Sequence, residues 1–336
     1  MNLYKLIIKL LKAVKKFTIS LILKAKNFRA SESIIIFGEA RGGSTWLMEM
    51  LNETLDVCIN WEPLHVRKGV IPRELNFGWR PFIPKDTRNE TYFFLFKKIH
   101  EYKIYSNWTT SYIKPLKLIQ SKHVLVKYVR ANMLVPYLLK NFKFKYKPIF
   151  LIRHPIDTCL SQMKTFEKDD NNITKFEVPN CINNERYIKH LEFINNLKSK
   201  LEVKIATWCI NNCDTINQID NYDTLYVIFY SDLLFYPEEE LKAYLNKNQL
   251  KSYIKKLNQV NYRKASSADF DSEYRNNVNE QLFKNFDMLD DIKKEKIQKI
   301  FDYFEFRLFT AYSPYPNKQY LVCRNVSGIW KANIFI

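Results

Sequence analysis

Short apolar runs alternate with amphipathic stretches along the middle of this chain. The first run, SIIIFG at residues 33–38, is rich in β-branched side chains and ends in glycine, a pattern typical of a buried strand. After a polar loop, TWLMEMLNE at 45–53 places its apolar residues at helical spacing. These residues predict a strand, a loop and a helix in that order.

The same order recurs downstream. Three later apolar runs each precede a helical pattern: HVLVKY at 123–128, KPIFLI at 147–152 and TLYVIFY at 224–230. Helices are expected near 132–141, around DTCLSQM at 157–163, from Pro237 and the acidic triplet 238–240 onward, over 185–218 and over 290–305. Strands that alternate with helices form parallel, doubly wound sheets, so the pattern predicts an α/β, P-loop-like three-layer fold with a central parallel sheet flanked by helices.

The remaining parts of the chain set the domain boundaries. A length of 336 residues with 46% hydrophobic residues suits one large folded domain, which we expect at 31–310. Residues 60–120 form an insertion rich in Trp, Tyr, Phe and Pro, and such insertions often shape the substrate site of α/β enzymes. Residues 1–30 precede the domain as a basic amphipathic helix, and 311–336 follow it as a C-terminal segment without an interpretable pattern.

The first 23 residues mix apolar side chains with five lysines, at positions 5, 9, 12, 15 and 16. Four of these lysines recur at helical spacing opposite apolar residues such as Leu6, Leu10 and Val14. Five charges argue against a transmembrane span, and no small-residue cleavage site follows. Three interpretations stay open: an interfacial helix that contacts anionic lipid peripherally, a helix packed on the protein's own body, and a Golgi-type signal anchor.

The net charge and the cysteines narrow the class of protein only a little. A formal charge of +18 favours an anionic partner such as a nucleotide, a nucleic acid, an anionic glycan or a membrane surface, although a Lys- and Asn-rich source genome would produce the same excess. The six cysteines have no CxxC spacing and no adjacent His cluster, so the sequence predicts no metal site and fits a reducing compartment. We therefore expect a cytoplasmic protein, with residues 1–23 as a candidate membrane contact.

The turn GEARGGSTW, residues 38–46, carries the first candidate chemistry. It has the spacing of the nucleotide loop GxxxxGK[ST], but Ser44 stands where that loop has lysine. Backbone N–H groups and the following helix N-terminus can hold an anion, with Arg41 as a positive charge and Thr45 as a further donor. The loop predicts a phosphate or sulfate site, and a ligand-free turn is the alternative.

A second candidate anion site lies in RHPIDTCLS, residues 153–161. Arg153 directly follows a predicted strand, and Ser161 lies about two turns into the next helix. A charge at the carboxyl end of a strand and a hydroxyl on the following helix can bracket a second phosphate. A structural ion pair of Arg153 explains the arginine equally well.

Together these two segments resemble the sulfotransferases that use 3′-phosphoadenosine 5′-phosphosulfate (PAPS), and the carbohydrate O-sulfotransferases most closely. ARGGSTWL at 40–47 is similar to their 5′-phosphosulfate loop, and IFLIRHPIDTCLSQM at 149–163 to their 3′-phosphate motif. IATWCINN at 205–212 resembles their mid-chain Trp helix, and YVIFYSDLLFYPEEEL at 226–241 their Tyr–Asp–Leu segment. The four motifs occur in the family's order, which makes them more specific together than any one alone.

The resemblance implies roles for individual residues. It assigns the 5′-phosphosulfate to Arg41, Gly42, Gly43, Ser44 and Thr45, and the 3′-phosphate to Arg153 and Ser161. It places Trp46 and Tyr230 near the adenosine, and it makes RKASSADF at 263–270, with Arg263 and Lys264, the counterpart of a late basic loop that closes on the nucleotide. His154 stands where the family usually has Asp or Asn, so hydrogen bonding after that strand should differ.

The acceptor hydroxyl needs a base, and WEPLHV at 61–66 offers two. Glu62 occupies the position of the catalytic glutamate in the carbohydrate branch, so it is the expected base; His65 and a purely structural ion pair of Glu62 are the alternatives. Arg41 would stabilise the leaving phosphate, and Lys127 would assist unless it is an exposed strand-end charge. The expected reaction is in-line sulfuryl transfer without a metal.

Two other functions remain as alternatives, a P-loop kinase for a nucleoside or sugar and a non-catalytic basic protein that binds glycan or nucleic acid. The missing loop lysine counts against the kinase, and Glu62 beside an intact loop counts against the binding protein. With PAPS as co-substrate, we expect a glycan or glycolipid acceptor and no nucleic-acid partner. Trp61, Trp79 and Trp108 suit stacking on sugar rings, although each could equally belong to the core.

Overall fold

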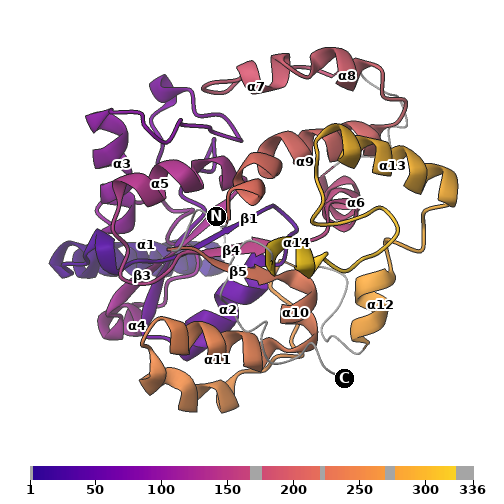
Figure 1. Ribbon diagram of the computed structural model, residues 1–336. Coiled ribbons are helices and arrows are strands. Elements are labelled where there is room, and N and C mark those ends of the chain that lie inside the picture. Colours follow the sequence, from indigo (N-terminus) through magenta and orange to yellow (C-terminus); the bar gives the residue numbers. More distant parts are fainter. Residues whose placement is uncertain (1–2, 167–175, 220–223, 269–276, 323–336) are drawn as a thin grey trace.

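The computed structural model describes residues 3–166, 176–219, 224–268 and 277–322. Its centre is a five-stranded sheet with the order β2-β3-β1-β4-β5, in which every neighbouring pair is parallel (Figure 1). The strands are β1 (Ile34–Gly38), β2 (Val57–Trp61), β3 (His123–Val129), β4 (Ile149–Ile152) and β5 (Tyr226–Phe229). The predicted α/β fold with a central parallel sheet is confirmed.

Helices surround this sheet. In chain order they are α1 (Leu3–Ala25), α2 (Ser44–Thr54), α3 (Glu90–His100), α4 (Pro115–Gln120), α5 (Val135–Asn141), α6 (Pro155–Phe166), α7 (Glu185–Ile188), α8 (Leu191–Asn195), α9 (Lys200–Asn217), α10 (Tyr230–Phe235), α11 (Pro237–Lys247), α12 (Val278–Phe283), α13 (Asp291–Tyr303) and α14 (Lys318–Val322). The helices expected near 132–141, around 157–163, from Pro237 and near 290–305 are therefore present.

The sheet is buried on both faces, which makes three layers. Within β1, Ile34 and Ile36 belong to the core formed with α2, α10 and α11, whereas Ile35 and Phe37 belong to the core formed with α5, α6 and α9. Successive side chains of a strand point to opposite faces, so a strand buried on both faces reads as a continuous apolar run. This is why SIIIFG was readable as a strand.

Two local features differ from the sequence prediction. Strand β2 was not predicted because VCINW is short and contains the polar Asn60, whose amide donates to the Ile99 carbonyl at 2.9 Å inside the core. The stretch 185–218 is three helices rather than one. Its longest part, α9, begins at a capping box in which Ser199 accepts from the Glu202 N–H and donates to the Glu202 carboxylate.

The carboxyl ends of the strands open a crevice. Helix α2, which follows β1, covers one face of the sheet, while α6, which follows the neighbouring β4, covers the other. In doubly wound sheets this divergence creates the ligand site, because the two connecting loops leave in opposite directions. The candidate motifs therefore lie at the edge of the sheet where a ligand is expected.

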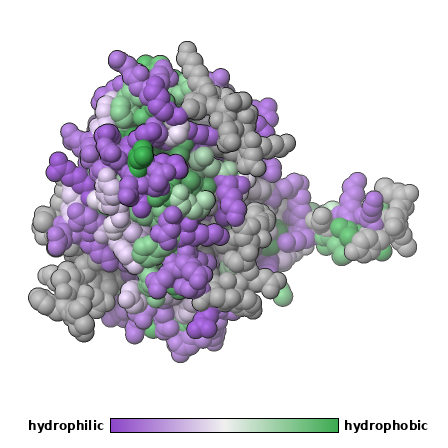
Figure 2. All heavy atoms as spheres, turned by 90° about the vertical axis from the view of Figure 1, so that its right-hand side faces the viewer, coloured by the Kyte–Doolittle hydropathy of each residue, from purple (hydrophilic) through white to green (hydrophobic). Residues whose placement is uncertain are grey.

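The two ends of the described chain are attached to the body of the protein in different ways. The C-terminal turns of α1 are anchored by Ile19 and Leu23, which are buried in the core, while the rest of the helix projects from the body as an arm (Figure 2). At the other end, α14 is tied down by Lys318, whose ammonium lies 2.9 Å from the Asp232 carboxylate. Of the predicted C-terminal segment 311–336, residues 323–336 lie outside the described part of the chain.

Candidate functional site

The loop between β1 and α2 has the geometry of an anion-binding turn. Arg41 and Gly43 adopt left-handed backbone conformations, with φ of 64° and 90°. A Cβ on Gly42 would lie 2.9 Å from the Glu39 carbonyl oxygen, and a Cβ on Gly43 would lie 2.6 Å from the Tyr230 ring, so both positions require glycine. Gly43 caps α2 without a side chain, and the first N–H groups of α2 are directed at the crevice.

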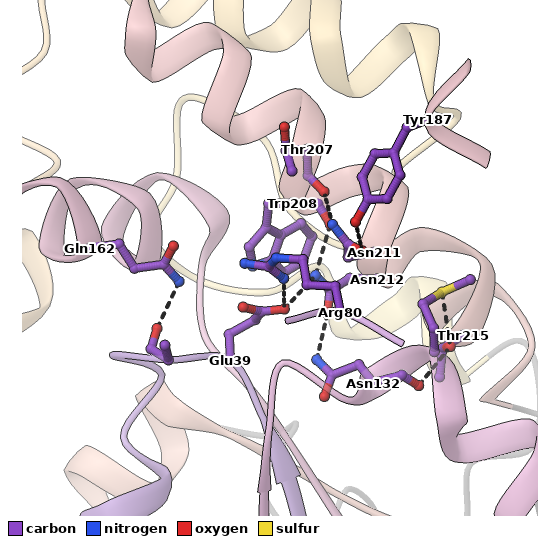
Figure 3. Close-up of polar contacts among 12 residues, drawn as sticks. Glu39, Arg80, Asn132, Gln162, Tyr187, Thr207, Trp208, Asn211, Asn212 and Thr215 are labelled. Carbon is purple, nitrogen blue, oxygen red and sulfur yellow. Dashed lines mark hydrogen bonds and ion pairs between the residues drawn. The ribbon is translucent and has the colours of Figure 1, made fainter. Parts of the chain in front are cut away.

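The loop is held from behind by buried polar contacts. Glu39, only 5% exposed, accepts from Arg80 at 2.7 Å and from the Asn212 amide at 3.3 Å, and Figure 3 shows both side chains converging on it. Gln162 of α6 donates to the Ala40 carbonyl at 2.8 Å. Burial by itself would raise the pKa of Glu39, but Arg80, then Arg130 and Asn212, outweigh it and hold that pKa below its usual value.

At the ends of β1, β4 and β5, residues from three motifs come together. The Arg41 Nε donates to the Ser161 hydroxyl at 3.1 Å, and the Arg153 guanidinium donates to the Arg41 carbonyl at 2.8 Å. The same guanidinium lies 4.2 Å over the ring of Tyr230, beside a small pocket that Phe286 also lines. Four residues predicted from separate stretches of sequence therefore meet at the ends of β1, β4 and β5.

Arg153 also forms the structural ion pair that the sequence left open. Its Nε donates to the carboxylate of Asp157, one turn into α6, and the Asn285 amide donates to the other oxygen of that carboxylate. This pairing holds the guanidinium at the start of α6. The ion pair and a phosphate contact are compatible, because a guanidinium has five N–H donors.

His154 performs locally what Asp or Asn would do at this position. Its Nδ1 accepts from the Ile156 N–H at 3.1 Å, which caps the start of α6, and its Nε2 lies 3.0 Å from the Thr310 carbonyl. Nδ1 accepts, so Nε2 carries the proton and donates to that carbonyl. Burial among Phe286, Phe301 and Phe309 lowers the pKa of His154 to about 4.

At the ends of β2 and β3 the structure brings together Glu62 and Lys127, and their predicted roles toward an acceptor stay predictions. Glu62 directly follows β2, and its Oε1 lies 2.8 Å from the Lys127 ammonium near the end of β3. The Lys127 side chain is 3% exposed and lies 3.7 Å over the ring of Trp61, so it is not an exposed strand-end charge. Burial lowers the pKa of Lys127, and the Glu62 carboxylate opposes that effect.

Strained backbone marks the same edge of the sheet. Glu62 directly after β2 has φ of 40°, and Arg130 directly after β3 has φ of 59°. The N–H of Glu62 donates to the Lys127 carbonyl at 3.1 Å, and that of Arg130 to the Gly38 carbonyl at 3.1 Å. Non-glycine residues with positive φ are uncommon and cluster at functional sites, so two of them here, together with Arg41 in the loop, support a site at this edge.

The alternative base, His65, has a structural environment. Its Nδ1 accepts from the N–H groups of Arg67 and Lys68, both at 3.2 Å, and its ring lies edge-on to Trp79 and Trp108. Burial lowers the pKa of His65. These contacts account for His65 as part of a turn and an aromatic cluster, whereas Glu62 faces the crevice with Lys127.

Three residues assigned to the nucleotide lie less directly in the crevice. Trp46 is 3% exposed and belongs to the core around α2, so its contact with adenosine stays a prediction. Arg263 and Lys264 are exposed at the start of their segment. The same segment reaches the loop further on, where the Ala268 carbonyl accepts from Arg41 at 2.5 Å; residues 269–270 of the predicted closing loop lie outside the described residues.

Sequence reasoning missed the residues that support the loop and one that lines the crevice. These are Glu39, Arg80, Gln162, Asn212 and Arg130. Glu39 and Gln162 stand within the quoted motifs, and Arg130 follows a predicted strand, so their positions were a signal that could have been used. Asn212 also stands within a quoted motif, whereas Arg80 offered no signal, because it reaches Glu39 from 41 residues away in the insertion.

No group of three or more His, Cys, Asp and Glu side chains is arranged to hold a metal ion across 3–166, 176–219, 224–268 and 277–322. Within those same ranges, every helix is too short or too polar to cross a lipid bilayer.

No protein-family model matches the chain, and no curated protein matches it. Among solved structures, the chain is similar to a sulfotransferase domain from the curacin biosynthetic pathway, with a TM-score of 0.41 and 17% identity over 83% of this chain and 99% of that one. A likeness at this level carries no argument about activity, so any function must be argued from the crevice itself.

Proposed function

We propose that this protein is an O-sulfotransferase that moves a sulfuryl group from PAPS to a hydroxyl of a carbohydrate or glycolipid. The observation that carries the proposal is the meeting of Arg41, Ser161 and Arg153 beside the N-terminus of α2. Two anion-binding elements are thereby joined in one crevice, as a donor with phosphate groups at both its 5′ and 3′ positions requires.

The residues of the crevice fit such a donor. The N-terminus of α2, with the Ser44 and Thr45 hydroxyls, would hold the 5′-phosphosulfate, and Arg41 would lie beside it. Arg153 and Ser161 would hold the 3′-phosphate. The crevice supplies cations and N–H donors on both sides, which suits a ligand that carries charge at both ends.

Donor binding requires the crevice to open. The pocket beside Arg153 and Tyr230 has a volume of only about 10 Å³, which is water-sized. Arg41 is engaged by the Ser161 hydroxyl and by the Ala268 carbonyl, and both contacts can be exchanged for phosphate oxygens. We therefore expect the segment that ends at Ala268 to move when the donor binds.

The chemistry that the chain must supply is proton removal and charge stabilisation. PAPS brings a sulfuryl group already activated by its bond to phosphate. As the new oxygen–sulfur bond forms, Glu62 takes the hydroxyl proton, and the electron pair of the breaking bond leaves with adenosine 3′,5′-bisphosphate. Lys127 holds Glu62 Oε1, and Oε2 makes no hydrogen bond to the described part of the chain, so it can accept the proton.

A carbohydrate acceptor is supported by the exposed tryptophan of the insertion. Trp79 is 42% exposed, whereas Trp61 is 7% exposed and packs on Lys127 and Tyr112 as part of the core. An exposed, flat aromatic ring beside a crevice can pack on the apolar face of a sugar. Of the three tryptophans considered from sequence, Trp79 suits this role best.

The donor assignment is tested by thermal unfolding in the presence of a chelator. Adenosine 3′,5′-bisphosphate should raise the Tm of the full chain without metal, because binding to the folded state alone stabilises it. Stabilisation by magnesium and ATP only would replace the proposal with a kinase. Transfer from radiolabelled PAPS, screened over glycans, glycolipids and phenols, then tests the acceptor, and bisphosphate binding without transfer to any of them would favour a non-catalytic protein.

A further inference from the structure

An aromatic wall with a cation at each end lies beside Glu62. The ring of His65 is 4.8 Å from that of Trp79 on one side and 4.8 Å from that of Trp108 on the other. The guanidinium of Arg130 lies 5.0 Å over Trp79, and the ammonium of Lys68 lies 4.7 Å over Trp108. The wall therefore presents flat rings between two positive charges.

Arg130 is a cation of this crevice that forms no ion pair with a carboxylate among the described residues. Glu39 is paired with Arg80 at 2.7 Å, and Glu62 with Lys127 at 2.8 Å. The guanidinium of Arg130 makes no hydrogen bond or ion pair within the described part of the chain, and only the rings of Trp79 and Phe166 contact it. A half-buried guanidinium with available donors attracts an oxyanion.

The oxyanion that Arg130 would bind is placed on the acceptor side by the location of its guanidinium. Trp79 and Phe166, which flank its guanidinium, are 42% and 55% exposed, so the group faces the open part of the crevice. Other cations are present on the proposed nucleotide side. Arg153 donates to the Arg41 carbonyl, and Arg41 donates to the Ser161 hydroxyl. Burial, and after it the neighbouring Arg80, lower the pKa of Arg130, and the Glu39 and Glu62 carboxylates oppose both effects.

We propose that the acceptor is an acidic saccharide, whose rings lie along the wall of Trp79, His65 and Trp108 and whose acidic groups bind Arg130 and Lys68. This inference rests on the proposed sulfotransferase function and names the acceptor class. A hydroxyl of the bound saccharide would then meet Glu62, which is paired with Lys127 at 2.8 Å.

The test compares two saccharides that differ in charge but not in their hydroxyl groups: an unsulfated chondroitin tetrasaccharide, which carries glucuronate, and the same tetrasaccharide with its carboxylates converted to neutral primary amides. Wild type should show a KM about tenfold lower for the acidic form. Arg130→Gln should raise that KM toward the value of the neutral form, with the remaining preference due to Lys68, and should leave the KM of the neutral form unchanged. Arg88→Gln, an exposed arginine of the same insertion, is the matched control and should behave as wild type.

Each other outcome has a definite meaning. Equal KM values for the two saccharides in wild type, or an equal rise for both in Arg130→Gln, would overturn the inference. A loss of stabilisation by adenosine 3′,5′-bisphosphate in Arg130→Gln would move Arg130 to the donor site, and intact stabilisation shows that the variant is folded. If wild type binds the bisphosphate but sulfates neither saccharide, the inference fails alone; if it does not bind the bisphosphate, the proposed function fails.

A second feature, independent of the crevice, is the apolar stripe on α1. Its large side chains are 47% to 65% exposed: Leu6, Ile7, Leu10, Leu11, Val14, Phe17 and Leu21. At 100° per residue these positions form one face, and the buried Ile19 and Leu23 lie on the opposite side, against the body. The stripe therefore faces away from the protein along the projecting arm seen in Figure 2.

The charges of α1 are complementary to an anionic surface. Lys5, Lys9, Lys15 and Lys16 are exposed beside the stripe or behind it, and α1 contains no acidic residue. The neighbouring α4 adds Leu116 and Ile119, which are 78% and 56% exposed, and Lys26 ties the two elements together through the Ile119 carbonyl at 2.6 Å. An apolar stripe with lysines around it is the pattern of a helix that lies in a membrane interface.

We infer that α1 lies on the surface of a bilayer that contains anionic lipid, with its stripe in the acyl boundary and the body of the protein held above. The full chain should co-sediment with vesicles of phosphatidylcholine mixed with phosphatidylglycerol, and less with vesicles of phosphatidylcholine alone. Replacing both Leu10 and Phe17 by Gln, which leaves the net charge unchanged, should weaken binding at least roughly tenfold. Ile292→Gln, on an exposed apolar residue of α13, is the control and should bind as wild type.

Two results would overturn this inference. Unchanged binding in the double variant would mean that overall positive charge alone attracts the vesicles. A wild-type chain that is dimeric in solution without lipid, and becomes monomeric in the double variant, would mean that a second copy of the chain covers the stripe.

Discussion

The two halves of the crevice are built in different ways. In the half formed by β1 and β4, Arg41, Ser161 and Arg153 contact one another and the loop backbone directly. In the half formed by β2 and β3, Glu62 and Lys127 form an ion pair, and Arg130 is held by aromatic rings. Under the proposed function, the first half binds the phosphates of the donor, and the second half provides the base and a cation for the acceptor.

This difference separates binding from chemistry within one site. Side chains that are already satisfied by hydrogen bonds exchange those bonds for a ligand and add little reactivity. A carboxylate with one oxygen held and the other available can move a proton. Substitutions in the two halves should therefore have separable effects, on donor affinity in one half and on turnover in the other.

The largest difference between the effect on turnover and the effect on donor affinity is expected for Glu62→Gln. The amide cannot take the hydroxyl proton, so kcat should fall by roughly 10²- to 10⁴-fold, the usual contribution of a general base. The affinity for adenosine 3′,5′-bisphosphate should stay unchanged. Transfer from radiolabelled PAPS to the best acceptor of the screen, with titration of the bisphosphate by calorimetry, measures both. Unchanged turnover would remove Glu62 as the base.

Glu39 lies where the two halves meet. Glu39→Gln should mainly lower the free energy of unfolding. The substitution leaves the Arg80 guanidinium, 15% exposed, without its buried carboxylate, and breaking such a pair destabilises by about 3 kcal/mol or more. Urea unfolding of the variant measures the loss. Glu53→Gln on the exposed side of α2 is the matched control, and equal stability of the two variants would contradict a supporting role for Glu39.

On the nucleotide side, Arg153→Gln should weaken binding of adenosine 3′,5′-bisphosphate by roughly tenfold to a hundredfold. A hydrogen bond to a charged group contributes about 1.5–3 kcal/mol, which sets this range. The exposed Arg307 offers a control, because Arg307→Gln should bind as wild type. A fall in turnover at saturating donor, with unchanged affinity, would place Arg153 in the chemistry and break the comparison.

The smallest expected effect is a pH dependence of stability, caused by His154 in the half formed by β1 and β4. Burial lowers the pKa of His154 from its ordinary 6.5 to about 4, so the unfolded state binds a proton more readily than the folded state. Stability is therefore full above pH 6.5 and is lost as the pH falls toward 4, by about 2 kcal/mol at pH 5. His154→Asn, which keeps a cap for α6, should lose less stability between pH 7 and pH 5 in urea unfolding than wild type does.

The sequence predicted the residues of the candidate site in both halves, but it predicted their contacts to a different extent. Local spacing predicted Arg41 in one anion site and Arg153 with Ser161 in another, and the resemblance to the PAPS-dependent sulfotransferases joined the two sites. Glu62 and Lys127 were also predicted at the crevice, but their pairing was not, because 65 residues separate them and only the register of β2 against β3 brings them together. The roles of all these residues stay predictions until the variants are measured.

The sequence by itself determined the parallel α/β fold, the glycine turn between the first strand and its helix, and the amphipathic character of the first helix. Each depends on patterns within about twenty residues, namely hydrophobic period, glycine at strained positions and residues at strand ends. Only the tertiary structure decided that Arg80 and Asn212 hold Glu39, that Trp79 is exposed while Trp46 is core, and that Arg130 is left without a carboxylate. Those outcomes depend on which distant segments pack together, and burial then decides whether a charge is paired or available.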